Sequence, residues 1–467
     1  MGSFLGYYVM PHPPIVIPEI GRGEENKIIN TINACKKVGE EIATLKPDAI
    51  IIITPHGPVF RDAIAISRCD SLSGDLSDFG APQLRFNYNN NLDLVNTIGM
   101  CASNMGIKTV GIEADRAEIY DVSCQLDHGS MVPLYFINEK YSDFDLVRIT
   151  YGFLNKIDLY KFGTAIKEAV DMCNLNVVFI ASGDLSHRLK GDGPYKYSPM
   201  GKVFDEKIIE LLEKGDVKSI FSLDNRIVNE AGECGLRSFY IMLGAMTKRE
   251  IIGELLSYEG TFGVGYGVLK FNTKENPQKN TLDNLLQEKA KQVESLRTKE
   301  DTYVKLARES LEYYVREGKP LPVPNNLPSE MLNDKRGVFV SLKKEGELRG
   351  CIGTIAPTTD SLAKEIIRNA VEAGERDPRF FPVEEDELDD IVYSVDVLMP
   401  PEESNKEDLD PEKYGVIVKH GRKMGLLLPD LEGVDTPEKQ LEIALDKAGI
   451  SPDRQYEIER FEVVRHK

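Results

Sequence analysis

Short apolar runs alternate with stretches of helical spacing over residues 1–270, and this alternation constrains the fold more than any other feature of the chain. The runs FLGYYVM, AIIIIT, TVGIEA, DLVRITYG and VVFIASG have the length and β-branched content of buried strands. Apolar residues recur at helical spacing over 24–46, 92–105, 158–173 and 200–214. Strands that alternate with helices predict an α/β domain around a largely parallel sheet flanked by helices.

The pattern changes near residue 272. The stretch NTKENPQKNTLDNLLQEKAKQVESLRTKE is polar, charged and without a strand pattern, so we expect a first domain at 1–272 and a linker with a helix at 273–297. Residues 298–467 contain further strand-like runs and helical patterns. Those runs lie at 336–355, 391–399, 414–429 and 457–466, and the helical patterns near 301–317, 359–374 and 437–448. This part is predicted to be a smaller α+β domain.

Composition excludes several classes of protein. With 41% hydrophobic residues, the 467-residue chain is apolar and long enough for two or three packed domains. Its apolar runs are far shorter than the roughly 20 residues of a membrane helix, and a signal pattern is lacking, so we expect a cytoplasmic protein without a membrane partner. A net charge of −19 argues against nucleic-acid binding. The seven cysteines form no CxxC pair, which argues against a disulfide framework.

Four of the six histidines fall in predicted loops of the first domain, namely His12, His56, His128 and His187. Three of these loops follow a predicted strand directly, and in open α/β sheets ligands gather at the carboxyl ends of strands. A single histidine is ordinarily structural, because imidazole often bonds a neighbouring carbonyl group. Four histidines in such positions, beside glycine and proline, instead favour a metal or catalytic site.

The stretch NEAGECGLRSFYIMLGAM offers a third metal ligand, because Glu230, Glu233 and Cys234 precede a predicted amphipathic helix. A carboxylate beside two histidines gives the facial triad of non-haem iron, whereas a thiolate gives a softer site. Near a helix start Cys234 is expected to have a lowered pKa, which favours ligation or nucleophilic attack. A small buried cysteine on the apolar face of the helix is the alternative.

The ordered motifs MPHPP, TPHGPVF, DHGSMVPL, SGDLSHR and AGECG resemble the class III extradiol ring-cleaving (LigB-like) dioxygenase superfamily over residues 1–272, and within it the Memo-like branch. The resemblance implies that His12 and His56 bind a metal ion. It also implies that His187 is the general base and that His128 is another active-site histidine. Asp184, three residues before His187, is expected to orient that histidine or to form a turn.

In ring-cleaving members a glutamate completes the iron site, and the resemblance aligns it with Cys234 or, one residue away, with Glu233. Fe(II) is the expected cofactor, and a thiolate ligand would shift the preference towards copper or zinc. The resemblance implies a phenolic or related small-molecule substrate. Removing a phenolic proton near neutral pH suits His187.

The second domain resembles the AMMECR-type domain over 298–467, through GVFVSLKKEGELRGCIGT, ERDPRFFPV and YGVIVKHGRKMGLLLP. Proteins that join this domain to a Memo-like one occur beside radical-SAM enzymes in the AmmeMemoRadiSam group, so the resemblance implies a radical-SAM partner. Cys351 follows Arg349 and Gly350, which predicts a thiol that a ligand can approach. A strand cysteine packed in a small core is the alternative.

Three functions are compatible with these residues. The first is a metal-dependent enzyme that acts on a phenolic compound, by ring cleavage with dioxygen or by non-oxidative carbon–carbon bond cleavage. The second is a metal-binding redox protein, which would cycle its metal without consuming an organic substrate. The third is a non-catalytic interaction module. The sequence is also compatible with a homo-oligomer.

Overall fold

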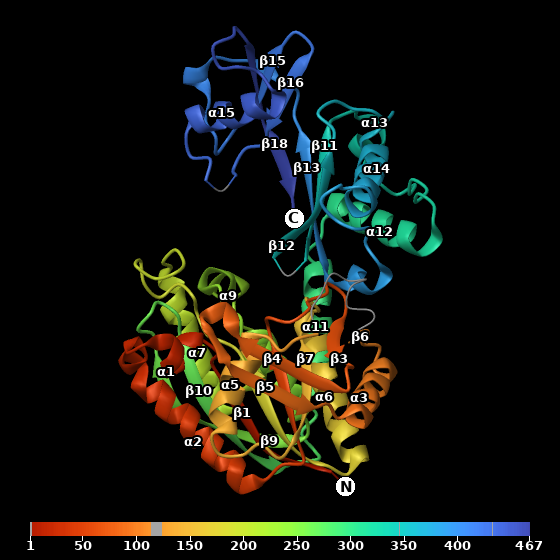
Figure 1. Ribbon diagram of the computed structural model, residues 1–467. Coiled ribbons are helices and arrows are strands. Elements are labelled where there is room, and N and C mark those ends of the chain that lie inside the picture. Colours follow the sequence, from red (N-terminus) through yellow and green to blue (C-terminus); the bar gives the residue numbers. More distant parts are fainter. Residues whose placement is uncertain (1, 114–123, 345, 432) are drawn as a thin grey trace. The chain divides into compact units, whose positions relative to one another are not determined.

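The computed structural model describes residues 2–113, 124–344, 346–431 and 433–467. The chain divides into two compact units, Met1–Glu288 and Lys289–Lys467, so the division falls inside helix α11 (Thr281–Arg297). Figure 1 labels the helices and strands of both units. Strand β10 continues to Glu275, past the expected end of the first domain at residue 272.

The first unit is built on an eight-stranded sheet in the order β6-β3-β7-β2-β8-β1-β10-β9. Its strands are β1 (Ser3–Met10), β2 (Ala49–Thr54), β3 (Ile64–Ser67), β6 (Thr109–Ile112), β7 (Asp145–Thr150), β8 (Asn176–Ser182), β9 (Arg249–Glu259) and β10 (Tyr266–Glu275). The central strands β7, β2, β8 and β1 are parallel. The strands β3 and β10 are antiparallel to their central neighbours, so the sheet is mixed around the predicted parallel centre.

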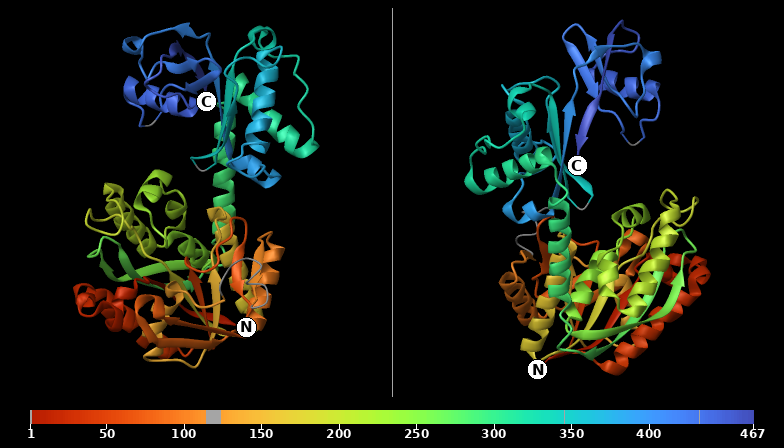
Figure 2. Two further views of the ribbon diagram at one scale, coloured as in Figure 1. Left: turned by 45° about the horizontal axis from the view of Figure 1, so that its top comes forward. Right: turned by 180° about the vertical axis from the view of Figure 1, so that it is seen from behind.

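Helices cover both faces of this sheet (Figure 2). On one face lie α2 (Ile29–Leu45) and α5 (His128–Asn138), and on the other lie α3 (Leu92–Asn104), α6 (Lys156–Cys173), α7 (Pro199–Lys214) and α10 (Leu236–Ala245). All six residues of β2 are buried as a result. Burial on both faces explains the continuous apolar run, which is typical of parallel strands between helices.

Smaller elements complete the first unit. A separate hairpin consists of β4 (Ser71–Leu76) and β5 (Ala81–Asn89), and short helices are α1 (Pro18–Gly21), α8 (Val217–Phe221) and α9 (Asn225–Ala231). Among the described residues of the whole chain, every helix is too short or too polar to cross a membrane.

The second unit contains two four-stranded antiparallel sheets, ordered β12-β11-β13-β18 and β14-β17-β15-β16. Their strands are β11 (Val338–Lys344), β12 (Glu347–Gly353), β13 (Ile391–Leu398), β14 (Glu402–Glu403), β15 (Gly415–His420), β16 (Lys423–Leu427), β17 (Glu457–Phe461) and β18 (Val463–His466). The helices are α12 (Thr302–Glu317), α13 (Ser329–Asn333), α14 (Leu362–Glu375) and α15 (Pro437–Ala448). Helices α12 and α14 share a core with the first sheet, and α15 shares one with the second, which agrees with the expected α+β class.

Candidate metal centre

His12 and His56 meet at one edge of the first-unit sheet. His12 follows β1 and His56 follows β2, and both strands are parallel to β8, which lies between them. Their carboxyl ends therefore lie at the same edge. The two Nε2 atoms are 3.0 Å apart, and the rings are nearly perpendicular.

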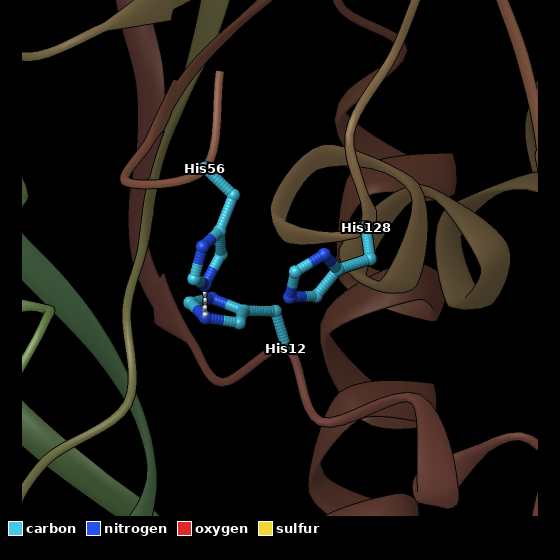
Figure 3. A group of neighbouring side chains, drawn as sticks. All are labelled: His12, His56 and His128. Carbon is cyan, nitrogen blue, oxygen red and sulfur yellow. Dashed lines mark hydrogen bonds between the residues drawn. The ribbon is translucent and has the colours of Figure 1, made fainter. Parts of the chain in front are cut away.

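His128 joins this pair from the first turn of α5 (Figure 3). Its ring stacks on that of His56 with centroids 4.1 Å apart. One ring nitrogen from each of His12, His56 and His128 can be chosen so that all three lie within 4.8 Å of one another. The structure thus places His128, predicted as an active-site histidine outside the ligand set, in the same group as the two predicted ligands.

Ser182 fixes which nitrogen of His12 carries the proton. The Ser182 hydroxyl donates to the Gly129 carbonyl at 2.5 Å, and its oxygen lies 2.9 Å from His12 Nδ1. Since the hydroxyl proton is already committed, Oγ accepts the Nδ1 proton of His12. The lone pair of His12 Nε2 then faces His56, which is the arrangement that a metal ligand requires.

Burial keeps these imidazoles neutral. It lowers the pKa of His12 well below the ordinary value, and the neighbouring histidines lower it further. Burial also lowers the pKa of His56, and burial together with His56 lowers that of His128 to about 4. Neutral imidazoles keep free lone pairs at pH 7, so the donor set fits a divalent cation.

Cys234 lies beside His12, with Sγ 3.7 Å from His12 Nε2. Its loop is held against the segment that follows β8, because the backbone N–H groups of Cys234 and Gly235 donate to the Asp184 carbonyl at 3.4 and 3.1 Å. The close approach needs glycine, since a Cβ at Gly183 would lie 2.1 Å from Gly235 Cα. The Tyr151 hydroxyl donates to the Cys234 carbonyl at 3.0 Å.

The expected lowered pKa of Cys234 is wrong, because the structure indicates a raised one. Burial raises the pKa of the thiol well above its ordinary value, and the charge of Asp184 raises it further. Helix α10 begins only at Leu236, whose N–H is taken by the Glu233 carboxylate at 2.6 Å. The helix end therefore offers Cys234 little positive field. A bound metal ion remains able to displace the thiol proton.

The two glutamates of this stretch are engaged elsewhere. One carboxylate oxygen of Glu233 caps α10 in the bond just described. Glu230 pairs with Arg226 at 2.9 Å and accepts from Ser198 Oγ at 3.1 Å, and these contacts lower its pKa. The structure therefore brings Cys234, and not Glu230, to the histidines.

Asp184 is bound to His12. Its Oδ1 accepts from the His12 backbone N–H at 2.9 Å, and its Oδ2 lies 3.9 Å from His12 Nε2. Burial raises the pKa of Asp184 to about 7. The contacts link this carboxylate to the first predicted metal ligand, whereas Asp184 was expected to orient His187 or to form a turn.

His187 borders the same group from the loop after β8. Burial, followed by the charges of His56 and Arg188, lowers the pKa of His187 to about 4. The ring stacks on Tyr195 with centroids 5.1 Å apart. Its buried Nε2 has no hydrogen-bond partner within the described part of the chain, so it is free to accept a proton.

No sequence motif singled out Ser182, Tyr151 or Tyr195 as site residues. Ser182 had a detectable signal, because it is the polar last residue of an apolar strand, as Thr54 is in β2. Tyr151 and Tyr195 had none, since their partners are far along the chain or depend on the path of a loop.

In the second unit, Arg349 and Cys351 lie on β12 but serve different contacts. The Arg349 guanidinium donates to Glu387 at 2.8 and 3.1 Å and to the Phe381 carbonyl at 3.0 Å. Cys351 is half-buried, and its sulfur accepts from the Ser341 hydroxyl at 3.3 Å. The guanidinium is thus directed at the 381–387 loop.

The motif RDPRFF packs along the same strand. The Asp377 carboxylate accepts from the Cys351 N–H at 2.9 Å and from Arg379 Nη2 at 2.6 Å. Arg379 Nη2 also donates to the Cys351 carbonyl at 3.3 Å. Because β12 is the end strand of its sheet, these side chains satisfy backbone groups that would otherwise lack a strand partner.

Comparison with known families gives two matches. Residues 6–269 match the family described as the catalytic LigB subunit of aromatic ring-opening dioxygenase, and residues 304–466 match AMMECR1. The two matches agree with the two-domain layout expected from the motifs.

Relatives extend this result. A protein of Clostridium acetobutylicum is 52% identical over 466 residues, which covers 100% of this chain and 99% of that protein. A protein of Thermotoga maritima is 54% identical over 171 residues, covering 36% of this chain and 98% of its own. Among solved structures, an uncharacterized protein of Pyrococcus horikoshii has 33% identity and a TM-score of 0.33, and covers 35% of this chain and 88% of its own.

Proposed function

The chain belongs to the family of catalytic LigB subunits of aromatic ring-opening dioxygenases, and from this premise we propose that it is a metal-dependent enzyme acting on a phenolic or related small molecule. The proposed metal is Fe(II), with copper or zinc as alternatives. The proposed reaction is ring cleavage with dioxygen or non-oxidative carbon–carbon bond cleavage. We place this activity in the cytoplasm, and the fusion to an AMMECR1 domain motivates a radical-SAM protein as a partner.

The observation that carries the proposal is the orientation of His12. Its Nδ1 proton is held by Ser182, so its Nε2 lone pair points at His56 Nε2, 3.0 Å away. His12, His56 and His128 form a group of three nitrogen donors, and the Cys234 sulfur lies 3.7 Å from His12 Nε2; donors of this kind suit a transition metal.

In this proposal His12 and His56 are two ligands, and either Cys234 or His128 is the third. A bound metal ion would supply Lewis acidity, which lowers the pKa of a coordinated phenol or water. His187 is the base in this scheme, because its Nε2 has no hydrogen-bond partner in the described part of the chain and its imidazole is neutral at pH 7. Its pKa of about 4 makes it a weak base, so it would accept the phenolic proton only from a phenol whose pKa a bound metal ion has lowered. Stacking on Tyr195 holds the plane of the His187 ring.

Cys234 motivates a second candidate function. A sulfur ligand beside His12 favours softer metals than a carboxylate does, so the site is also suited to a metal-binding redox protein. Such a protein would change the oxidation state of its metal without consuming an organic compound.

The test begins with elemental analysis of protein purified without oxygen. Catechols and acyl-phenols are then screened with and without dioxygen, using wild type, His12→Ala and His187→Ala. The proposal expects substrate loss with wild type only, a metal-free His12→Ala protein, and a metal-loaded but inactive His187→Ala protein. Redox cycling without substrate loss would favour the second candidate. Protein that neither retains nor takes up metal would contradict both.

A further inference from the structure

Arg148 is a buried arginine whose guanidinium lacks acceptors. It lies on β7 with 1% of its surface exposed, whereas arginines are almost never fully buried unless paired. Its Nε, Nη1 and Nη2 have no hydrogen-bond partner among the residues that the structure describes. Burial of a cation without hydrogen bonds is costly, so an acceptor is expected beside it.

Asp127 is the opposite charge beside Arg148, but it does not satisfy the guanidinium. Its Oδ2 lies 3.5 Å from Arg148 Nη1, which is an ion pair rather than a hydrogen bond. The carboxylate accepts instead from Thr54 Oγ1 at 2.5 Å and from the N–H and hydroxyl of Ser130 at 3.1 and 3.2 Å. Asp127 is thus engaged in capping α5, and the guanidinium protons stay unused.

Two buried hydroxyl groups lie beside Arg148 on the same face of the sheet. Thr150 and Ser67 are 1% and 2% exposed, and neither hydroxyl has a hydrogen-bond partner in the described ranges. Thr150 is two residues beyond Arg148 on the same strand, so both side chains lie on one face of the sheet. Strand β3 pairs Ile66 with Ile149 in antiparallel register, and one further step sets Ser67 opposite Arg148.

Gly57 connects this cluster to the candidate metal centre. A Cβ at Gly57 would lie 2.1 Å from Thr150 Oγ1 and 2.4 Å from Arg148 Nη1. Only a glycine therefore lets the backbone pass over the guanidinium at this point. The residue before it is His56, so the cluster lies directly behind the loop that carries a candidate ligand.

We propose that Arg148, Thr150 and Ser67 form an anion-binding subsite behind the His56 loop and that its ligand is a carboxylate. The planar guanidinium matches two carboxylate oxygens, and the two hydroxyls supply further donors. The carboxylate comes either from a free small acid or from the compound processed at the metal centre. The subsite requires no metal, so it can be tested separately from the proposed function.

The experiment measures the melting temperature of the metal-free, full-length protein against formate or acetate, with sodium chloride at equal ionic strength as reference. A ligand that binds the folded state raises the melting temperature. Formate and acetate should raise that of wild type by several degrees in a saturable manner. Thr150→Val and Ser67→Ala should weaken the apparent affinity about tenfold each, because each removes one donor. Arg148→Met should abolish the response.

Ser257→Ala is the matched control, because its buried hydroxyl also lacks a partner in the described part of the chain but lies on β9. It should respond as wild type does. If Arg148→Met does not fold, the Thr150 and Ser67 variants carry the test. The proposal is overturned if wild type responds no more to formate than to chloride, or if these variants respond as wild type does.

A second arm identifies the source of the carboxylate. Binding of 4-hydroxybenzoate and of phenol, which differ only in the carboxylate, is measured calorimetrically with and without saturating formate. Competition by formate against 4-hydroxybenzoate alone assigns the subsite to the processed compound. Formate binding without competition assigns it to a free acid, and both results keep the subsite.

Discussion

Ser182 accepts a hydrogen bond from His12 Nδ1 while it donates to the Gly129 carbonyl, so one hydroxyl links β8, the His12 loop and helix α5. A hydrogen bond from the ring nitrogen that does not bind the metal sets the tautomer and the orientation of a metal-binding imidazole. We therefore expect Ser182→Ala to weaken metal binding about 10- to 100-fold. Competition with a chromophoric chelator measures this, and Ser257→Ala should leave the affinity unchanged. Equal affinity of Ser182→Ala and wild type would show that the hydroxyl does not orient the ligand.

The third ligand can be identified by comparing Cys234→Ala with His128→Ala. His12→Ala and His56→Ala should each abolish metal content, because these residues supply the two nitrogens that face one another. If Cys234 is the third ligand, Cys234→Ala should lose metal and the sulfur-to-metal charge-transfer band that Cu(II) loading produces, whereas His128→Ala should keep both. Loss of metal in His128→Ala, with metal retained in Cys234→Ala and no sulfur-to-metal band in wild type, would assign the ligand to His128.

The lowered pKa of Glu387 predicts that the second unit loses stability in acid. Burial by itself would raise the pKa of Glu387, but hydrogen bonds from Arg349 and Lys344 outweigh it and lower the pKa to about 2, from an ordinary 4.5. Since the folded pKa lies below the unfolded one, this group contributes its full stability above pH 4.5 and loses it as the pH falls towards 2.

Glu387→Gln should accordingly be less stable than wild type at pH 7, and the difference should shrink as the pH falls from 5 to 3. Urea unfolding followed at several pH values measures it. The control is Glu403→Gln, because Glu403 is exposed on a two-residue strand. A difference that stays constant with pH would contradict the ion-pair explanation.

Cys351 remains a predicted functional thiol in the second unit. Its half-buried sulfur accepts from Ser341, so serine at position 351 can keep that hydrogen bond. We expect Cys351→Ser to keep the melting temperature and to impair activity, and Cys351 to be alkylated faster than the buried Cys35. Slow alkylation together with a lowered melting temperature and normal activity would indicate a packing role.

Limited proteolysis tests the division of the chain. We expect cleavage within 273–298 and release of two folded pieces, because each unit has its own buried clusters. Among the residues of α11, only Leu285 is buried. Cleavage that begins elsewhere, or fragments that unfold, would contradict the predicted linker.

The sequence predicted the strands whose residues form a continuous apolar run. Continuous apolar runs gave β1, β2, β7 and β8, because burial on both faces demands such runs. The hairpin of β4 and β5 was missed, since its alternating exposed and buried residues include many polar ones. Strand β3 was also missed, and with it the antiparallel pairing of β3 with β7, because strand direction depends on the connections.

For the candidate site, strand ends predicted that His12 and His56 meet, because parallel strands share their carboxyl edge. Sequence spacing left Cys234, Glu233 and Glu230 open as third ligands. The structure separates them because Glu230 turns towards Arg226. No sequence pattern marked Arg148 as buried, because an arginine within an apolar strand is expected to face solvent. Its burial depends on the elements that pack over that face of the sheet.

The bonds that Asp377 and Arg379 make to the backbone of Cys351 have a consequence for the protein at high concentration. An end strand with free N–H and C=O groups is a template on which a second molecule can add a strand and begin an aggregate. Here a buried aspartate and an arginine occupy those groups at the middle of β12. We therefore expect the RDPRFF loop to hinder the addition of a strand from a second molecule to β12.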